Sequence, residues 1–338
     1  MMHSSQGGEE IPHFSDVERA AKRISPFIHK TPLFQSSLLN EFLGHSIVFK
    51  AECLQKIGAF KARGGINTVM WLVENGMSPQ HIVANSSGNH AQAVAWAAQQ
   101  QGIPSTIYMP ENVSQVKAQA TKAYGARVVL CEDRASVDKQ VEEASSQEGT
   151  YWIPPYNHPQ VIAGQGTAAY EALKELNGHV DAVFAPCGGG GLLSGTSLAT
   201  RALAPQARVI GVEPLKANDA AESRRSGSIQ SLKSTPATIA DGARTPALGE
   251  LTFPFIRDLD AFYEVDEPHI LYWTQWLQHL LKLHVEPTSA MVMQGVVEWL
   301  ATQTSRQTVL VVLSGGNVDA ATMQSIWAEN LLDKQPSL

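Results

Sequence analysis

The sequence predicts an α/β protein made of two open, mostly parallel α/β domains. Short apolar segments alternate with amphipathic helical segments in two separate series, and this alternation is typical of parallel sheets. The chain has 338 residues, of which 43% are hydrophobic and 17% are charged, so it can build two compact cores. We expect a small domain at residues 81–156, inserted into a large domain formed by residues 1–80 and 157–338, with a ligand cleft between the two.

Few elements are predicted before the insertion. Residues 1–10 are polar and are expected to form a frayed terminus. Apolar spacing predicts a helix at Phe14–Ile24. Thr31, Pro32 and Leu33 are expected to be extended, because a proline disfavours helical geometry in the residue that precedes it. Ile47–Glu52 is predicted to be a buried strand that Gly58 terminates. A helix follows, with one apolar face formed by Ile66, Val69, Met70 and Val73.

The two alternating series supply the predicted sheets. Strands of the insertion are expected at Ile82–Ala84, Ser105–Met109, Arg127–Leu130 and Tyr151–Ile153. Its helices are expected at Ala91–Gln100, Val113–Tyr124 and Ser136–Ala144. Later strands are expected at Ala182–Ala185, Val209–Val212, Phe262–Val265 and Val309–Leu313. Later helices are expected near Gln165, at Leu192–Leu203, through Trp273–Leu283 and after Pro287. Ligands of such sheets bind beyond the carboxyl ends of the strands.

Composition narrows the class of protein. A net charge of −7 and the lack of a long basic run argue against nucleic-acid binding. No apolar stretch approaches the roughly 20 residues of a membrane span, and the N-terminus lacks an apolar signal core. The three cysteines are widely spaced among apolar residues, which favours reduced core thiols. We therefore expect a cytoplasmic protein that acts on a small molecule.

Lys61 is the first candidate catalytic residue. It follows a glycine turn in Lys56–Gly64, which reads K-I-G-A-F-K-A-R-G. A desolvated lysine loses proton affinity and becomes an amine nucleophile that can hold an aldehyde as a Schiff base. Arg63 is expected to lower the lysine pKa further. The alternative is an ordinary surface lysine on a helix.

Gly188–Gly191 is the second candidate site. The four glycines stand between a predicted strand and a predicted helix, where backbone N–H groups and the helix dipole favour an anion. The alternative is a tight strand–helix turn, and the segment matches neither the Walker A nor the G-x-G-x-x-G pattern. One aldehyde site and one phosphate site together predict pyridoxal 5′-phosphate.

Three further segments carry polar groups at strand ends. Asn85–His90 reads N-S-S-G-N-H and favours a carboxylate pocket with a proton-transferring hydroxyl, or else simple helix capping. Ser314 follows an apolar strand and can meet a ring nitrogen, or else form a Ser-Gly turn. Glu213 and Asp219 lie in one loop with intervening carbonyls, an arrangement that suits Mg²⁺, Mn²⁺ or Ca²⁺. A solvated acidic loop is the alternative.

These segments together resemble fold type II pyridoxal-phosphate enzymes, which are tryptophan synthase β-like, and within them the serine/threonine dehydratase and serine racemase group. The resemblance runs from about Val17 to Ala328. It rests on F-K-A-R-G, S-S-G-N-H-A-Q, P-P-Y-N-H-P, V-I-A-G-Q-G-T, G-G-G-G-L-L-S-G, T-I-A-D-G, E-P-T and L-S-G-G-N-V-D. Ala59 and Ala91 depart from many members, which have serine and glycine there. Fungal-type serine racemases are the most similar group.

The resemblance implies a role for each site residue. It makes Lys61 the Schiff-base lysine and Ser87 the acid–base group on the opposite ring face. Phe60 packs on the ring, Asn89 bonds the ring hydroxyl and Ser314 bonds the ring nitrogen. The phosphate is bound by Gly188, Gly189, Gly190 and Gly191. The substrate carboxylate is held by Ser86, Ser87, Asn89 and His90, and the divalent cation by Glu213, the Ala217 carbonyl and Asp219.

The resemblance also implies a function. It predicts a homodimeric serine racemase that also dehydrates L-serine and L-threonine to a 2-oxo acid and ammonia. The alternative on the same machinery is a threo-3-hydroxyaspartate dehydratase, for which Arg134 is a candidate to bind the second carboxylate. The alternative from another class is a non-catalytic protein that binds pyridoxal phosphate or an amino acid.

Overall fold

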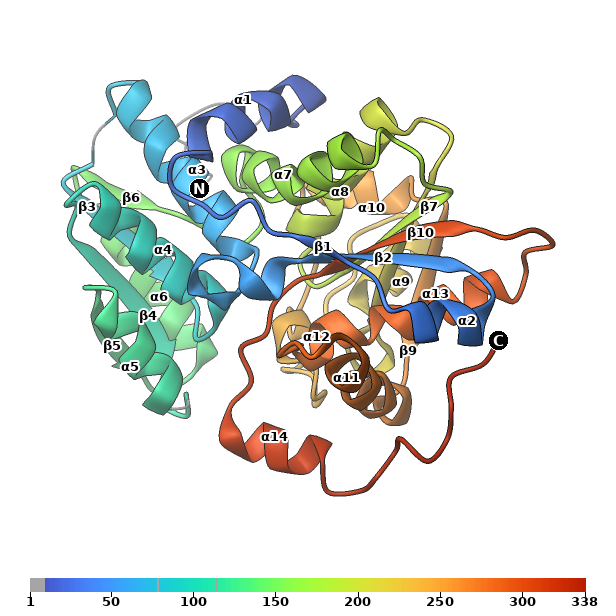
Figure 1. The fold of residues 1–338 in the computed structure, drawn as a ribbon. Coiled ribbons are helices and arrows are strands. Elements are labelled where there is room, and N and C mark those ends of the chain that lie inside the picture. The colour runs from blue at the N-terminus through green and yellow to red at the C-terminus, as the bar shows by residue number, and fades with distance from the viewer. Residues whose placement is uncertain (1–9, 78, 114) are drawn as a thin grey trace.

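The structure, a computed structural model, describes residues 10–338 except Ser78 and Ser114. Residues 1–9, where we expected a frayed terminus, lie outside the described part. Two sheets form the framework, and Figure 1 shows the four strands β3–β6 on one side and the larger sheet on the other. The prediction of two mostly parallel α/β units is confirmed. The domain boundaries at residues 80 and 156 remain predictions.

The larger sheet has six strands in the order β1-β2-β10-β7-β8-β9. All neighbours are parallel except β1 and β2. Its strands are β1 (Leu33–Phe34), β2 (Ser46–Ala51), β7 (Ala182–Pro186), β8 (Arg208–Pro214), β9 (Ala261–Val265) and β10 (Thr308–Leu313). The smaller sheet is wholly parallel, with the order β5-β4-β3-β6. Its strands are β3 (His81–Asn85), β4 (Ser105–Pro110), β5 (Arg127–Cys131) and β6 (Thr150–Trp152).

Helices cover both sheets. Those of the smaller unit are α4 (Asn89–Gln100), α5 (Gln115–Ala123) and α6 (Arg134–Ser145). Those that precede or follow it are α1 (Phe14–Ile24), α2 (Ser37–Leu43), α3 (Lys61–Glu74), α7 (Pro159–Glu175), α8 (Gly191–Leu203), α9 (Asp219–Ser226), α10 (Phe253–Arg257), α11 (Glu267–Leu281), α12 (Pro287–Ala290), α13 (Val292–Leu300) and α14 (Ala320–Ile326). Four short 3₁₀ segments are η1 (Glu52–Leu54), η2 (Lys56–Gly58), η3 (Leu215–Ala217) and η4 (Asp241–Ala243).

Alternate residues of the large strands face two separate cores. Phe49, Phe184 and Val311 pack with α2 and α11–α13 on one face. Their chain neighbours Val48, Val183 and Leu310 pack with α7 and α8 on the other face, as the two-residue period of a strand requires. Figure 1 shows these two helix layers above and below the sheet. Strands buried on both faces explain why the sequence shows continuous apolar runs here.

The predicted strands are all present, within one to two residues at each end. The predicted helix Val113–Tyr124 corresponds to α5, which begins later, at Gln115, and ends at Ala123; Ser114 lies outside the described residues. Helices α2, α9, α10 and α14 were not predicted. They are short, and α9 is strongly polar, so hydrophobic periodicity is a weak signal for them. Among the described residues, no helix combines the length and apolar character that a membrane crossing requires.

Candidate active site

The segment before Lys61 is held by the loop that follows β10. The Phe60 amide donates to the Ser314 carbonyl at 2.9 Å, and the Gly316 amide donates to the Gly58 carbonyl at 3.0 Å. Asn317 closes the pairing, because its side-chain amide donates to the Ile57 carbonyl at 2.7 Å. Gly58 has a φ of +72°, which confirms the predicted glycine turn. Lys61 therefore begins α3 directly beside the carboxyl end of an inner strand.

The Lys61 amine lies in a poorly hydrated position. Its Nζ donates to the Pro155 carbonyl at 2.6 Å and lies 5.1 Å from the centre of the Phe60 ring. Burial lowers the lysine pKa to about 8, while the Glu286 carboxylate acts in the opposite direction. This agrees with the expectation of an activated amine. The structure therefore gives Lys61 the electrostatic setting of a nucleophile rather than that of a surface lysine.

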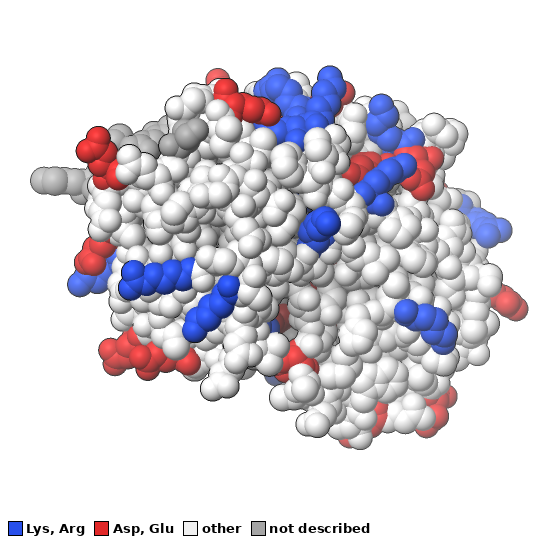
Figure 2. All heavy atoms as spheres, turned by 60° about the vertical axis from the view of Figure 1, so that its left-hand side comes forward, with Lys and Arg blue, Asp and Glu red and all other residues white. Residues whose placement is uncertain are grey.

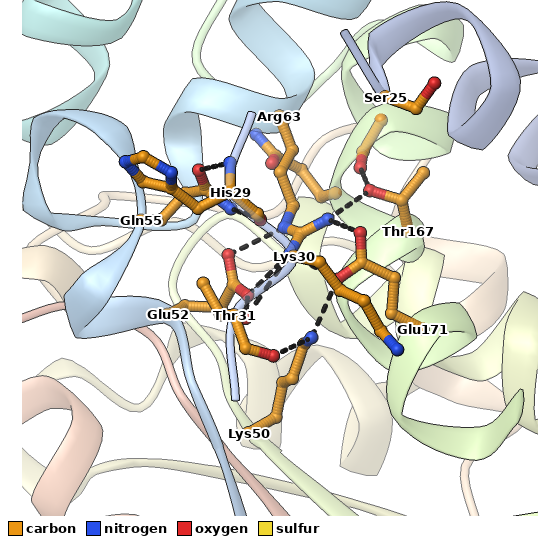
Figure 3. A network of polar contacts seen from close by, with 12 residues as sticks. Ser25, His29, Lys30, Thr31, Lys50, Glu52, Gln55, Arg63, Thr167 and Glu171 are labelled. Carbon is orange, nitrogen blue, oxygen red and sulfur yellow. Dashed lines mark hydrogen bonds and ion pairs between the residues drawn. The ribbon is translucent and has the colours of Figure 1, made fainter. Parts of the chain in front are cut away.

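Arg63 does not lower the Lys61 pKa as we expected, because its charge is neutralised by two carboxylates. Its guanidinium is wholly buried and pairs with Glu52 at 2.6 Å and with Glu171 at 2.8 Å. Lys50 pairs with the same Glu171 at 2.7 Å. Figure 3 shows these side chains meeting from the start of α3, η1, β2 and α7. The network fixes the first turn of α3, and with it the backbone of Lys61.

Glu286 was not predicted as a site residue, yet it lies at the centre of the cluster. It accepts hydrogen bonds from Asn89 Nδ2 at 3.2 Å and from Ser314 Oγ at 3.2 Å. Burial raises its pKa to about 7, and Asp241 contributes in the same direction. Glu286 belongs to the E-P-T motif, but a single carboxyl group forms no residue pattern that would indicate a site. The hydrogen bonds of Glu286 and Ser289 to Gly315 bring the Glu286 carboxylate to Ser314.

The glycine loop has the form of an anion cradle at the N-terminus of α8. Among the described residues, no acceptor receives a hydrogen bond from the amides of Gly188–Gly191. A side chain at Gly189 would collide with the Tyr156 ring, and one at Gly190 would lie 2.8 Å from Thr252 Cβ. Gly190 also has a φ of +90°. Only glycines fit here, and their free amides suit a phosphate.

The Asn85–His90 loop leads from β3 into α4, and helix capping does not explain its hydroxyls. The cap residue is Gly88, with no side-chain cap. Ser86 Oγ accepts from the Gly88 amide at 3.2 Å, whereas Ser87 Oγ bonds to no described residue. His90 Nε2 donates to the Ile153 carbonyl at 2.8 Å, and burial lowers its pKa to about 3, so the ring is neutral. Ser87 thus keeps a free hydroxyl in a loop whose Asn89 contacts Glu286 of the site.

The predicted cation loop contains two buried carboxylates. Glu213 accepts from the Ala221 amide at 2.7 Å and from the Ala220 amide at 3.3 Å. Asp219 Oδ2 is buried without any described partner, and burial raises the Asp219 pKa to about 7. Ala217, which lies between these two residues in the sequence, is also buried. In the described part of the chain, no three His, Cys, Asp or Glu side chains cluster as metal ligands, so a cation here needs backbone oxygen as well.

Charge is otherwise spread over the surface. Figure 2 shows Lys and Arg side chains scattered among Asp and Glu and neutral residues over the face drawn. All three cysteines are free; Cys131 and Cys187 are buried and Cys53 is half-buried. Burial raises the pKa of Cys53 to about 12, so this thiol is a poor nucleophile. The chemistry of the described residues is therefore concentrated around Lys61.

Comparison with known proteins identifies the family of this chain. The model of the pyridoxal-phosphate dependent enzyme family matches residues 24–315. The chain is 44% identical to L-threo-3-hydroxyaspartate ammonia-lyase of Saccharomyces cerevisiae, with 91% of this chain and 94% of that protein covered. It is 42% identical to serine racemase of Schizosaccharomyces pombe, with 91% and 95% covered. The structure of maize serine racemase superposes with a TM-score of 0.88 at 35% identity, covering 94% of this chain and 98% of that one.

The chain belongs to the pyridoxal-phosphate dependent enzymes. Within that family it falls in the fold type II group that includes the serine/threonine dehydratases and serine racemases, as the sequence motifs predicted. The free amides of the glycine loop and the desolvated Lys61 fit the phosphate and the aldehyde of that cofactor. A non-catalytic binding protein is thereby disfavoured.

The lowered pKa of Lys61 predicts how the apoprotein takes up its cofactor. Only the neutral amine attacks an aldehyde. The uptake rate of pyridoxal 5′-phosphate, followed by absorbance, should therefore rise with pH and be half-maximal near the Lys61 pKa of about 8. Glu286→Gln should move the midpoint to lower pH, because the carboxylate raises the lysine pKa. Lys56→Ala is the control and should leave the midpoint in place. A midpoint near the ordinary lysine value of about 10.4 would contradict this account.

Proposed function

We propose that this protein is a serine racemase that also dehydrates L-serine and L-threonine to the 2-oxo acid and ammonia. The observation that carries the proposal is the pair Lys61 and Ser87. Lys61 opens α3, while Ser87 stands in the loop after β3 of the smaller sheet with an unengaged hydroxyl. Two proton-transfer groups supplied by different units suit a reaction that moves a proton on either face of one carbon.

The residues that would hold the cofactor are those predicted from sequence. Gly188–Gly191 would bind its phosphate, Phe60 would pack on its ring, and Asn89 and Ser314 would meet its polar ring atoms. Bound pyridoxal phosphate supplies an electron sink that makes the Cα proton of an amino acid acidic. Ser314, which lies 3.2 Å from Glu286 Oε1 and 2.9 Å from Ser289 Oγ, would offer the ring a neutral hydroxyl rather than a carboxylate. The neutral hydroxyl favours elimination or reprotonation over transamination.

The substrate carboxylate would be bound by the Asn85–His90 loop. Ser86 and Ser87 would supply hydroxyl donors and the first turn of α4 would supply amide donors, and the helix N-terminus adds a positive dipole. Asn89 can contribute only part of its amide, because it donates to Glu286 and accepts from Asn317 at 2.8 Å. The His90 ring is committed to Ile153 through Nε2, so its backbone amide is the group that would reach a carboxylate.

A second function on the same machinery is elimination from threo-3-hydroxyaspartate. Its support is Arg134, which begins α6 at the carboxyl end of β5. The 44% identical yeast relative carries that activity in its name, and the 42% identical fission-yeast relative is named a racemase. The two reactions share the removal of the same Cα proton. They differ in whether the substrate side chain carries a carboxylate.

We also propose a divalent cation at Glu213, Asp219 and the Ala217 carbonyl. Two buried carboxylates with raised pKa values repel one another, and Asp219 Oδ2 has no described partner. A hard cation would relieve both costs, because it favours carboxylate and carbonyl oxygen. The homodimer and the cytoplasmic location remain predictions from the family resemblance.

Ser87→Ala separates racemisation from dehydration. Racemisation requires a proton donor on the face opposite Lys61, whereas elimination from L-serine requires proton removal on one face. The variant should lose interconversion of L- and D-serine and dehydration of D-serine. Dehydration of L-serine should persist, lowered by about 10²-fold or less. Chiral chromatography of serine beside a pyruvate assay measures both reactions.

Ser146→Ala is the matched control, because it removes an exposed hydroxyl from the C-terminus of α6. It should leave both reactions at the wild-type rate. If Ser87→Ala racemises serine at the wild-type rate, Ser87 does not transfer the proton and has only a structural role in its loop. A wild-type protein that eliminates without racemising would instead favour a simple dehydratase.

Chelation tests the proposed cation. Removal of divalent ions should lower the melting temperature and the activity, and Mg²⁺ should restore both, because two buried carboxylates regain their counter-charge. Asp219→Asn should make the protein insensitive to chelator and to Mg²⁺, while Asp258→Asn, on an exposed carboxylate, should retain the wild-type response. A wild-type protein whose melting temperature ignores chelator would identify the segment as an acidic loop without a metal.

A further inference from the structure

The carboxyl edge of the smaller sheet gathers the residues that face the substrate. β3, β4, β5 and β6 are parallel, so the segments that follow them leave from the same edge. The Asn85–His90 loop follows β3, and Arg134 follows β5. Pro155, which accepts from Lys61 Nζ at 2.6 Å, follows β6. This edge therefore meets Lys61, and Arg134 is the cation at the start of α6.

The charge of Arg134 acts on Tyr156, and the Tyr156 ring packs against the glycine loop. Burial raises the pKa of Tyr156, and the Arg134 guanidinium opposes that rise. The Tyr156 ring packs directly against Gly189, and its Cβ lies where a side chain at Gly191 would come within 3.1 Å. Half of the Arg134 side chain is exposed to solvent, and its partner Asp138 bonds to Asn85 at the start of the substrate loop. A cation in this place can bind a negative group on the far end of a bound amino acid.

The Arg134 guanidinium already forms an ion pair with Asp138. Arg134 Nε donates to the two carboxylate oxygens of Asp138 at 3.2 and 3.4 Å. Asp138 Oδ1 also accepts from Asn85 Nδ2 at 2.8 Å. Asn85 is buried and is oriented from its other side, because its Oδ1 accepts from Trp152 Nε1 at 3.0 Å. The Asp138 carboxylate is therefore positioned by two donors, one of them in the substrate loop itself.

We propose that Asp138 sets the preference of this site between monocarboxylate and dicarboxylate substrates by competing for Arg134. The inference rests on the proposed function. A substrate with a second carboxylate must displace Asp138 from Arg134 and then lies close to the Asp138 charge. Serine and threonine meet neither cost. An exposed pair four residues apart on a helix is weak, so displacement is feasible, but the repulsion between the two carboxylates persists.

Asp138→Asn tests the competition directly. The amide oxygen still accepts from Asn85, so the loop is retained while the negative charge is removed. The ratio of kcat/KM for threo-3-hydroxyaspartate to that for L-serine should rise about three- to tenfold. The gain should shrink as salt is added, because the pair is half exposed.

Two further variants complete the measurement. Arg134→Gln should lower the same ratio roughly tenfold or more, because it removes a charge-assisted hydrogen bond to the second carboxylate. Glu143→Gln breaks the Lys139–Glu143 pair, which has the same spacing on the same helix. It should leave the ratio within about twofold.

The outcomes separate this inference from the proposed function. If the wild type consumes both substrates and Asp138→Asn leaves their ratio unchanged, the role of Asp138 is overturned and the proposed function stands. If the wild type consumes neither, the proposed function fails. Calorimetric binding of succinate and of propionate to the holoenzyme then decides the competition. Selectively tighter succinate binding by Asp138→Asn supports it, and equal binding by variant and wild type overturns it.

Discussion

The backbone pairing between residues 58–60 and the loop after β10 supports the whole site. Two main-chain hydrogen bonds and the Asn317 side chain join a segment near residue 60 to one near residue 316. This contact sets the start of α3 beside Ser314, and Ser314 in turn meets Glu286. The Lys61 amine can therefore be poorly hydrated while its backbone stays fixed, because hydrogen bonds from the loop after β10 hold the residues just before it. A nucleophile needs this combination, because desolvation lowers its pKa while the fixed backbone limits its reach.

A second constraint acts from the other side of α3. Arg63 and Lys50 balance Glu52 and Glu171, so three buried charges and the partly exposed Glu171 sum to no net charge. Burying such groups costs free energy, and the network adds little net stability compared with an apolar core. Removal of one partner leaves a buried charge and costs about 3–5 kcal/mol. The network instead joins β2, η1, α3 and α7 through their side chains (Figure 3).

Much of the fold and part of the site could be predicted from sequence because their signals are local. The strands are apolar runs buried on both faces, Gly58 and Gly190 have positive φ values that favour glycine, and Gly189 has no room for a side chain. Glu286 could not be found in this way, because its contact with Ser314 spans 28 residues and no motif announces it. Arg63 was misread, because its partner Glu171 lies 108 residues away. Short polar helices such as α9 were missed because their periodicity is weak.

The central claim is that Lys61, and no other lysine, holds the cofactor. Borohydride reduction of the holoenzyme followed by peptide mass spectrometry tests it most directly, since reduction fixes the cofactor to its lysine. The account predicts a yellow protein whose label is on Lys61, and loss of both colour and label in Lys61→Ala. Lys50 is buried against Glu171, and Lys117 is paired with Asp241, so neither has a free amine. A label on Lys50, Lys56 or Lys117 would contradict the account.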